Sequence, residues 1–251
     1  MQAGHATIDS IRAVQSLVPG NASIALWGYS GGSFASAFAA ELAEQYAPEL
    51  AISGVALGGL LVNLTETALI TGLIQPPGVL GLTAQYPEAR EYILDQLHDT
   101  GPYNKSTFLA ALHNSPQQDI DLYGNQSIWP YFRDGQGTLQ NRMLQRIVHS
   151  ETILGYHGTP QMPLFVYKAV HDEATPIAST DALVDRWCGV GVEVLYQRNV
   201  VGGHGDEARS GNGHALEWLG AVFDGERDVG FPTHGCRIED VSWTADGALR
   251  G

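Results

Sequence analysis

Apolar residues in the first sixty positions follow two different patterns. Over residues 6–17 they recur every three or four positions, which predicts a helix that ends at Pro19-Gly20. Residues 23–27 and 52–57 are short continuous apolar runs of the length of buried parallel strands, and residues 33–46 between them have a helical spacing. A strand, a turn, a helix and a strand in this order predict a βαβ unit, and therefore an α/β fold with a parallel sheet flanked by helices.

The pattern changes between residues 60 and 160, where strand-like runs disappear. Helical spacings are found over 88–98, 106–114 and 138–153, and residues 123–137 form a turn-rich link. The α/β pattern then returns, with strands expected at 163–170 and 192–197 and helices at 180–187 and 214–223. We therefore expect a core built from residues 1–59 and 161–251, with residues 60–160 as a helical insertion between two of its strands.

Composition and charge narrow the possible functions. The chain has 251 residues, of which 44% are hydrophobic and 16% charged, so it can form a well-packed core. Its formal net charge of −14 makes nucleic acid and anionic membrane surfaces poor partners. The two cysteines are too few for a multi-thiolate metal site but could form one disulfide.

The start of the chain has no basic segment followed by an apolar stretch, so no signal peptide is expected within it. Residues 50–87 carry Glu66 as their only charge but contain no continuous apolar run of membrane-spanning length, and we interpret them as buried or ligand-facing. Four Asn-X-Ser/Thr sequons, at Asn21, Asn63, Asn104 and Asn125, favour a secretory origin, although unmodified surface asparagines are the alternative.

A candidate nucleophile stands in Gly28-Tyr29-Ser30-Gly31-Gly32, which fits the G-x-S-x-G pattern. The pattern follows an expected strand and opens an expected helix, which is the context of a nucleophile elbow. We expect that side chains at Gly28 and Gly32 would clash in so sharp a turn, which would explain the glycines at both positions. The backbone N–H of Gly31 would lie at the helix N-terminus, where it can stabilise an oxyanion.

A serine nucleophile needs a base and an acid that orients the base, and in this fold the acid precedes the histidine along the chain. Asp172 follows the strand expected at 163–170, with Glu173 as the competing acid, and His204 lies on a glycine-rich loop after the strand expected at 192–197. We interpret the other eight histidines as surface or structural residues, with His214 at the start of a helix. His204, Asp206 and His214 match no zinc-ligand spacing, so we expect neither a metal nor a cofactor.

These segments resemble the secretory lipase family of α/β-hydrolases, a fungal and bacterial family that includes the yeast A-type lipases and the trichothecene deacetylases. The resemblance rests on GYSGG, on PLFVYK followed by HDEATP, and on VVGGHGDEA, and it extends from about residue 4 to residue 223. It implies Ser30 as nucleophile, His204 as general base and acid, and Asp172 as the orienting acid. It also implies a disulfide between Cys188 and Cys236, for which two free thiols are the alternative.

The resemblance further implies that the insertion is a cap over the active site, with residues 50–87 forming either an apolar wall for an acyl chain or ordinary packing. Only about 22 residues precede the first expected strand, whereas an α/β-hydrolase reaches its elbow after several strands. We therefore expect the N-terminal strands, the second oxyanion donor and any signal peptide to be missing from this chain.

Three functions remain open at this point. The first is a secreted serine ester hydrolase, a lipase or deacetylase acting on lipid or small-molecule esters. The second is acyl transfer or peptide cleavage by the same triad, and the third is a catalytically impaired fragment or non-catalytic remnant.

Overall fold

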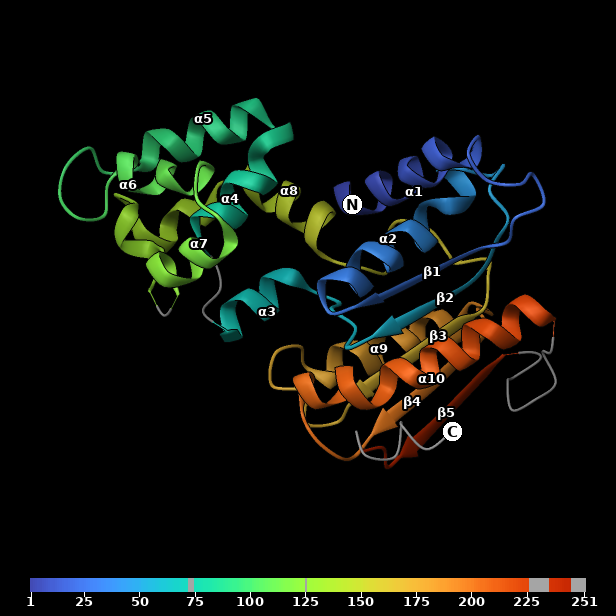
Figure 1. The fold of residues 1–251 in the computed structure, drawn as a ribbon. Coiled ribbons are helices and arrows are strands. Elements are labelled where there is room, and N and C mark those ends of the chain that lie inside the picture. Colours follow the sequence, from blue (N-terminus) through green and yellow to red (C-terminus); the bar gives the residue numbers. More distant parts are fainter. Residues whose placement is uncertain (72–74, 125, 226–234, 245–251) are drawn as a thin grey trace. The chain divides into compact units, whose positions relative to one another are not determined.

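Five parallel strands form one sheet in which the strand order equals the chain order, β1-β2-β3-β4-β5 (Figure 1). The strands are β1 Ile24–Tyr29, β2 Ile52–Gly58, β3 Leu164–Ala169, β4 Val194–Asn199 and β5 Cys236–Val241. The computed structural model describes residues 1–71, 75–124, 126–225 and 235–244, so the sequon at Asn125 lies outside the described residues. The parallel sheet predicted from the apolar runs is confirmed.

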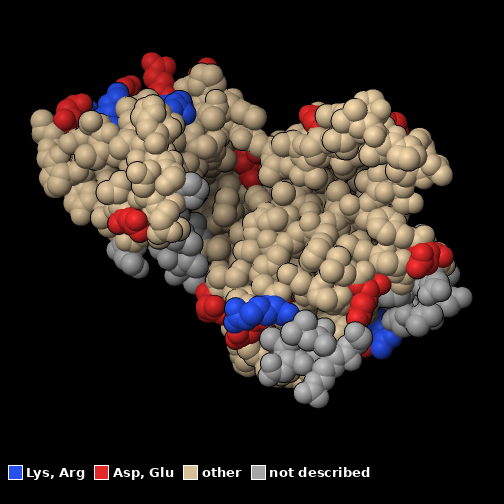
Figure 2. All heavy atoms as spheres, viewed as in Figure 1, with Lys and Arg blue, Asp and Glu red and all other residues tan. Residues whose placement is uncertain are grey.

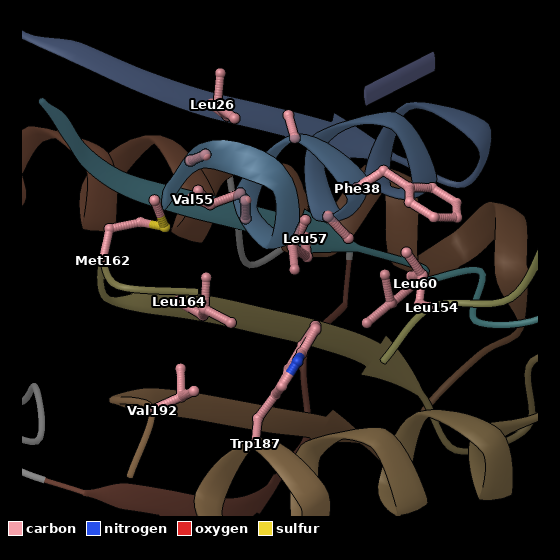
Figure 3. Close-up of a cluster of buried hydrophobic side chains, with 14 of the residues drawn as sticks. Leu26, Phe38, Val55, Leu57, Leu60, Leu154, Met162, Leu164, Trp187 and Val192 are labelled. Atoms are coloured by element: carbon pink, nitrogen blue, oxygen red, sulfur yellow. The ribbon is translucent and has the colours of Figure 1, made fainter. Parts of the chain in front are cut away.

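Helices cover both faces of this sheet (Figure 1). They are α1 Gln2–Gln15, α2 Gly31–Tyr46, α9 Ile177–Gly189 and α10 His204–Asp224. Figure 3 shows the core on one face, where Phe38 and Trp187 lie among aliphatic side chains of the strands such as Leu57 and Leu164. On the other face Trp218 of α10 stacks on Phe165 of β3, at 5.8 Å between ring centroids.

Strand β5 was not predicted, because none of its residues is buried and it has no continuous apolar run. It pairs in parallel with β4, so β4 is not the last strand of the sheet. A disulfide between Cys188 at the end of α9 and Cys236 at the start of β5 holds it there, which confirms the pairing expected from the family resemblance.

Helix α10 begins ten residues earlier than predicted, at His204 instead of His214. Glycines at 205, 211 and 213 lower the helix propensity of this segment, which is why the prediction began too late. Packing compensates: a Cβ on Gly211 would lie 2.5 Å from Tyr167, so only glycine allows the helix to approach the sheet so closely. The prediction that His204 lies on a loop and that His214 starts the helix was therefore wrong.

The chain divides into two compact units, Met1–Asn63 with Ile153–Gly251, and Leu64–Thr152. The second unit is helical, with its own core around Phe108, Tyr131 and Leu144. Its elements are α3 Leu64–Thr71, α4 Pro76–Leu82, η1 Thr83–Gln85, α5 Pro87–Gln96, α6 Lys105–Leu109, η2 Ala110–Leu112, α7 Pro116–Tyr123, η3 Trp129–Tyr131, η4 Gly135–Gln140 and α8 Arg142–Thr152.

Two helices predicted in this unit are divided in the structure. The helix expected over 138–153 is broken at Asn141, whose side-chain oxygen accepts hydrogen bonds from the first turn of α8, including one of 2.8 Å from the Met143 N–H. The helix expected over 106–114 is α6 followed by the 3-10 turn η2. None of the helices formed by the described residues is long and apolar enough to cross a membrane.

Acidic and basic side chains are sparse on the face shown in Figure 2, and uncharged residues occupy most of it. This agrees with the low proportion of charged residues in the chain.

Candidate active site

Ser30 is the single residue between the last residue of β1 and the first residue of α2. Its backbone has φ 53° and ψ −118°, and it is the one non-glycine residue with positive φ among the described residues. Its N–H donates a 2.9 Å hydrogen bond to the Gly58 carbonyl of β2, which holds the turn against the sheet. Backbone strain of this kind costs about 1–3 kcal/mol and concentrates at functional sites, so Ser30 is a candidate nucleophile.

Gly28 has the steric role that the pattern predicts. A Cβ at this position would lie 2.1 Å from the carbonyl carbon of Gly32. Gly32 itself is different, because a Cβ there would meet no atom within 4 Å. The prediction that both glycines avoid a clash therefore holds for Gly28 and was wrong for Gly32: the Gly32 backbone is the obstacle, and a Gly32 side chain would not be one.

Gly31 is exposed and begins α2, a helix of 16 residues. The N–H groups of the first helical turn have no partner within the helix and point toward its N-terminal end. The Gly31 N–H is therefore in a suitable place to stabilise negative charge that develops beside the Ser30 side chain.

Asp172 and His204 are joined by a hydrogen bond. Nδ1 of His204 lies 2.8 Å from Oδ2 of Asp172. The carboxylate side chain is fully buried, while the imidazole keeps 18% of its surface exposed. Asp172 lies shortly after β3 and His204 opens the helix that follows β4, so the carboxyl ends of two adjacent parallel strands bring them together.

Burial and three neighbouring groups determine the acidity of Asp172. Burial by itself would raise the pKa of this carboxyl. The hydrogen bond from His204, the charge of Lys168 and the N–H of Thr175 outweigh burial and hold the pKa of Asp172 well below its usual range. Asp172 is therefore an anion at every pH at which the imidazole can act as a base.

Glu173, the competing acid, bonds to the backbone of His204, whereas Asp172 bonds to its imidazole ring. Its Oε2 accepts a 2.9 Å hydrogen bond from the backbone N–H of His204. It lies so close to the chain that a Cβ on Gly203 would be 2.4 Å from the same oxygen. Glu173 thus holds the start of α10, and Asp172 is the acid bonded to the ring.

Tyr29 connects the serine turn to the histidine. Its hydroxyl donates a 2.5 Å hydrogen bond to the backbone carbonyl of His204, and the two ring centroids are 5.2 Å apart. Among the described residues no hydrogen bond joins the Ser30 hydroxyl to the His204 ring. The structure therefore brings Asp172 and His204 into contact, and places His204 against the residue that precedes Ser30.

Other residues suggested by the sequence have different partners. Asp206 forms an ion pair with Arg209, and His214 lies near Glu217 and stacks on Trp243 at 3.9 Å. His171, beside the acid, has an exposed side chain. No group of three or more metal-binding side chains is found in the described part of the chain.

Two buried groups near the site were missed by the sequence analysis. Lys168 of β3 forms a 3.1 Å ion pair with Asp172, and both side chains are fully buried. Glu207, one turn after His204, is also fully buried and accepts a 2.6 Å hydrogen bond from the amide of Asn199. The available signal for Lys168 was a lysine within an otherwise apolar strand. For Glu207 it was an acidic residue on the buried side of a helix.

A serine on a strained strand-to-helix turn, followed along the chain by a hydrogen-bonded acid and histidine at the ends of parallel strands, is the arrangement found in α/β-hydrolases. The five-stranded sheet with helices on both faces has that fold. The chain belongs to the secretory lipase family, whose family model matches residues 1–230.

Individual proteins agree with this assignment. The chain is 42% identical to the trichothecene C-3 esterase of Fusarium sporotrichioides over 95% of this chain and 56% of that esterase. It is 36% identical to lipase A of Arthroderma benhamiae over 89% of this chain and 49% of that lipase. The crystal structure of Candida antarctica lipase A superimposes with a TM-score of 0.81 and 25% identity, covering 98% of this chain and 60% of that protein. The chain thus spans about half the length of the curated relatives it matches.

Proposed function

We propose that this chain carries the catalytic site of a secreted serine ester hydrolase that acts on lipid or small-molecule esters. The observation that carries the proposal is the 2.8 Å Asp172–His204 pair held against the turn that bears Ser30. Family membership and the names of the relatives support ester hydrolysis, and the family description supports secretion.

Acylation would begin with His204. Because Nδ1 is bonded to the Asp172 anion, the ring carries its proton on Nδ1 and leaves Nε2 free to accept the Ser30 hydroxyl proton. The Ser30 oxygen attacks the ester carbonyl, and the Gly31 N–H stabilises the oxyanion. The imidazolium then protonates the departing alkoxide, which leaves as the alcohol, and an acyl-serine remains.

Deacylation would use the same groups in reverse. His204 takes a proton from water, and the resulting hydroxide attacks the acyl-serine carbonyl. The tetrahedral intermediate collapses, the serine oxygen recovers its proton from His204, and the carboxylic acid leaves. Asp172 stays ionised throughout and stabilises the imidazolium in both halves.

The substrate is proposed only as a class. The relatives include a protein named as a trichothecene esterase and others named as lipases. A panel that combines acetate esters of small alcohols with p-nitrophenyl esters of increasing acyl length would separate these two kinds of substrate.

Replacing the proposed nucleophile tests the function. We expect Ser30→Ala to abolish p-nitrophenyl ester turnover in the full chain, whereas Ser36→Ala, a control on the same helix, should retain it. Thermal unfolding of both variants would show that they remain folded. Equal turnover by Ser30→Ala and the parent chain would exclude Ser30 as the nucleophile.

A further inference from the structure

Lys168 is one of only two lysines in the chain, and it lies inside β3, where all six residues are buried. Its side chain is fully buried. Burying an ammonium without partners is costly, so a buried lysine at this position requires acceptors.

Three acceptors surround the ammonium group. Nζ donates to the Leu60 carbonyl at 3.1 Å and to Oδ2 of Asp172 at 3.1 Å. It also donates to the hydroxyl oxygen of Thr175, which in turn donates to Oδ2 of Asp172 at 2.9 Å. The ammonium is therefore held in a fixed position beside one carboxylate oxygen.

That oxygen is the one bonded to the imidazole. Oδ2 of Asp172 accepts hydrogen bonds from His204 Nδ1, Lys168 Nζ and the Thr175 hydroxyl. The other carboxylate oxygen, Oδ1, accepts hydrogen bonds from the backbone N–H groups of Ala174 and Thr175, at 3.0 and 2.8 Å. The negative charge of Asp172 is thus shared between the Lys168 ammonium and the histidine. A simple orienting acid would need only the histidine and the backbone N–H groups.

We propose that Lys168 is a positioning residue that acts through the Asp172 carboxylate on the His204 base and so sets the acidic limit of activity. This inference rests on the proposed function. The Lys168 charge offsets part of the stabilisation that the Asp172 anion gives to an imidazolium. Without that charge the Asp172 carboxylate would hold an imidazolium more strongly, so the acidic limit of activity would lie at a higher pH.

The protonation of Lys168 is consistent with this role. Burial lowers the pKa of Lys168 to about 8, and the Asp172 charge limits the decrease. The ammonium is therefore charged throughout the acidic range, in which a histidine base loses activity.

Several other titratable groups face this cluster and belong to the same electrostatic balance. Asp181 of α9 and Glu207 of α10 act on Lys168 by their charges, and Asp172 acts on the hydroxyl of Tyr29. These neighbouring groups are Tyr29 on β1, Glu173 after β3, Asp181 on α9 and Glu207 on α10.

Neutral replacements of Lys168 test the proposal. Lys168→Gln keeps a hydrogen-bond donor and Lys168→Met does not, but both remove the charge. We expect the acidic midpoint of kcat/KM for p-nitrophenyl acetate to rise by about one pH unit in both variants, and the plateau rate to fall by less than about tenfold. Lys105→Gln, the only other lysine replaced in the same way, should leave the profile unchanged.

A purely structural role would give a different result. If Lys168 only supports packing, its replacements lower the melting temperature and the plateau rate but leave the midpoint where it is in the parent chain. An unmoved midpoint in folded Lys168→Gln would overturn the proposal.

A second measurement needs no variant of Lys168. Because the chain has two lysines, selective 15N-lysine labelling gives two side-chain signals, which Lys105→Gln assigns. We expect the Lys168 signal to be that of a charged ammonium and to shift at the pH at which activity falls, since both groups share Oδ2. A neutral amine at this pH, or a signal that does not respond, would overturn the proposal even if the variants fail to fold.

Failure of this inference can be distinguished from failure of the proposed function. If the parent chain hydrolyses esters through Ser30 but Lys168→Gln keeps the parent midpoint, only the role of Lys168 is wrong. If the parent chain has no Ser30-dependent turnover, the hydrolase proposal itself is wrong.

Discussion

The hydroxyl of Tyr29 donates a 2.5 Å hydrogen bond to the backbone carbonyl of His204, across 175 positions of the chain. Tyr29 is the residue immediately before the candidate nucleophile, so the bond joins the end of β1 to the start of α10. Burial, together with the negative charges of Asp172 and Glu207, raises the pKa of Tyr29 well above its usual range. The hydroxyl therefore remains a hydrogen-bond donor at every pH of interest.

Tyr29→Phe should test this connection. The loss of one buried hydrogen bond is expected to cost about 1 kcal/mol and to lower the melting temperature by about 2–4 °C. We expect kcat to fall, because the hydrogen bond that anchors the His204 backbone is lost. The fall should be only several-fold, because the ring contact with His204 remains. Tyr46→Phe, which removes a surface hydroxyl bonded to Asp9, is the control and should affect neither stability nor kcat in this way. An unchanged melting temperature and kcat in Tyr29→Phe would contradict this role.

Replacement by alanine should affect stability differently at Gly28 and at Gly32, the first and last residues of the G-x-S-x-G turn. Gly28→Ala places a Cβ 2.1 Å from the Gly32 backbone, so we expect a loss of at least about 1–3 kcal/mol of stability and of most activity. Gly32→Ala meets no neighbour within 4 Å and lies in a helix, so it should be neutral or stabilise by about 0.5–1 kcal/mol. Chemical denaturation of the two variants makes the comparison, and equal losses at both positions would show that the described turn is wrong.

Glu207→Gln should make stability less dependent on pH. Burial raises the pKa of Glu207 despite the hydrogen bond from Asn199, and the charge of Asp172 adds to this. Its Oε1 is buried without a hydrogen-bond partner among the described residues. In the unfolded chain a glutamate loses its proton near pH 4.3, while the folded chain keeps it to higher pH. The folded state then binds more protons, so stability falls as the pH rises through the folded pKa.

The neutral glutamine avoids this loss. The melting temperature of Glu207→Gln minus that of the parent chain should therefore be higher at pH 8 than at pH 4. Glu217→Gln, on the same helix with 78% of its side chain exposed, should show no such change between the two pH values. A Glu207→Gln difference that is the same at both pH values would contradict the burial of a titrating carboxyl.

The disulfide should carry much of the stability of the sheet edge. Cys188 and Cys236 are 48 positions apart, and closing a loop of this length stabilises the folded state by about 4 kcal/mol in the chain-entropy model. We expect Cys188→Ser with Cys236→Ser to lower the melting temperature by about 8–16 °C. Reduction of the parent chain by a phosphine should have a similar effect, and the double variant should not respond to the reductant. A double variant as stable as the parent would contradict the prediction.

The fold was predictable wherever burial is continuous. Strands β2 and β3 are apolar runs because nearly all of their residues are buried, and this is visible in the sequence. Strand β5 is largely exposed, so its residues carry no such signal, and the disulfide and the pairing with β4 hold it in the sheet. The start of α10 was missed because tertiary contacts around Gly211 override its low helix propensity.

The candidate site was predictable as an order of residues but not as a set of contacts. The serine turn, the acid after β3 and the later histidine follow from local patterns. The hydrogen bond from Lys168 to the Leu60 carbonyl does not, because the two residues lie 108 positions apart. For the same reason the bond between Tyr29 and His204 has no signature in the sequence.

Covalent labelling with a fluorophosphonate most directly tests whether these residues form one catalytic site. The purified full chain would be treated with the probe, and the modified residue located by mass spectrometry. The account predicts a single adduct on Ser30 that is strongly reduced in His204→Ala and retained in His214→Ala, whose ring lies on the same helix away from Asp172. A folded chain that forms no adduct, or labels Ser30 equally well without His204, would contradict it.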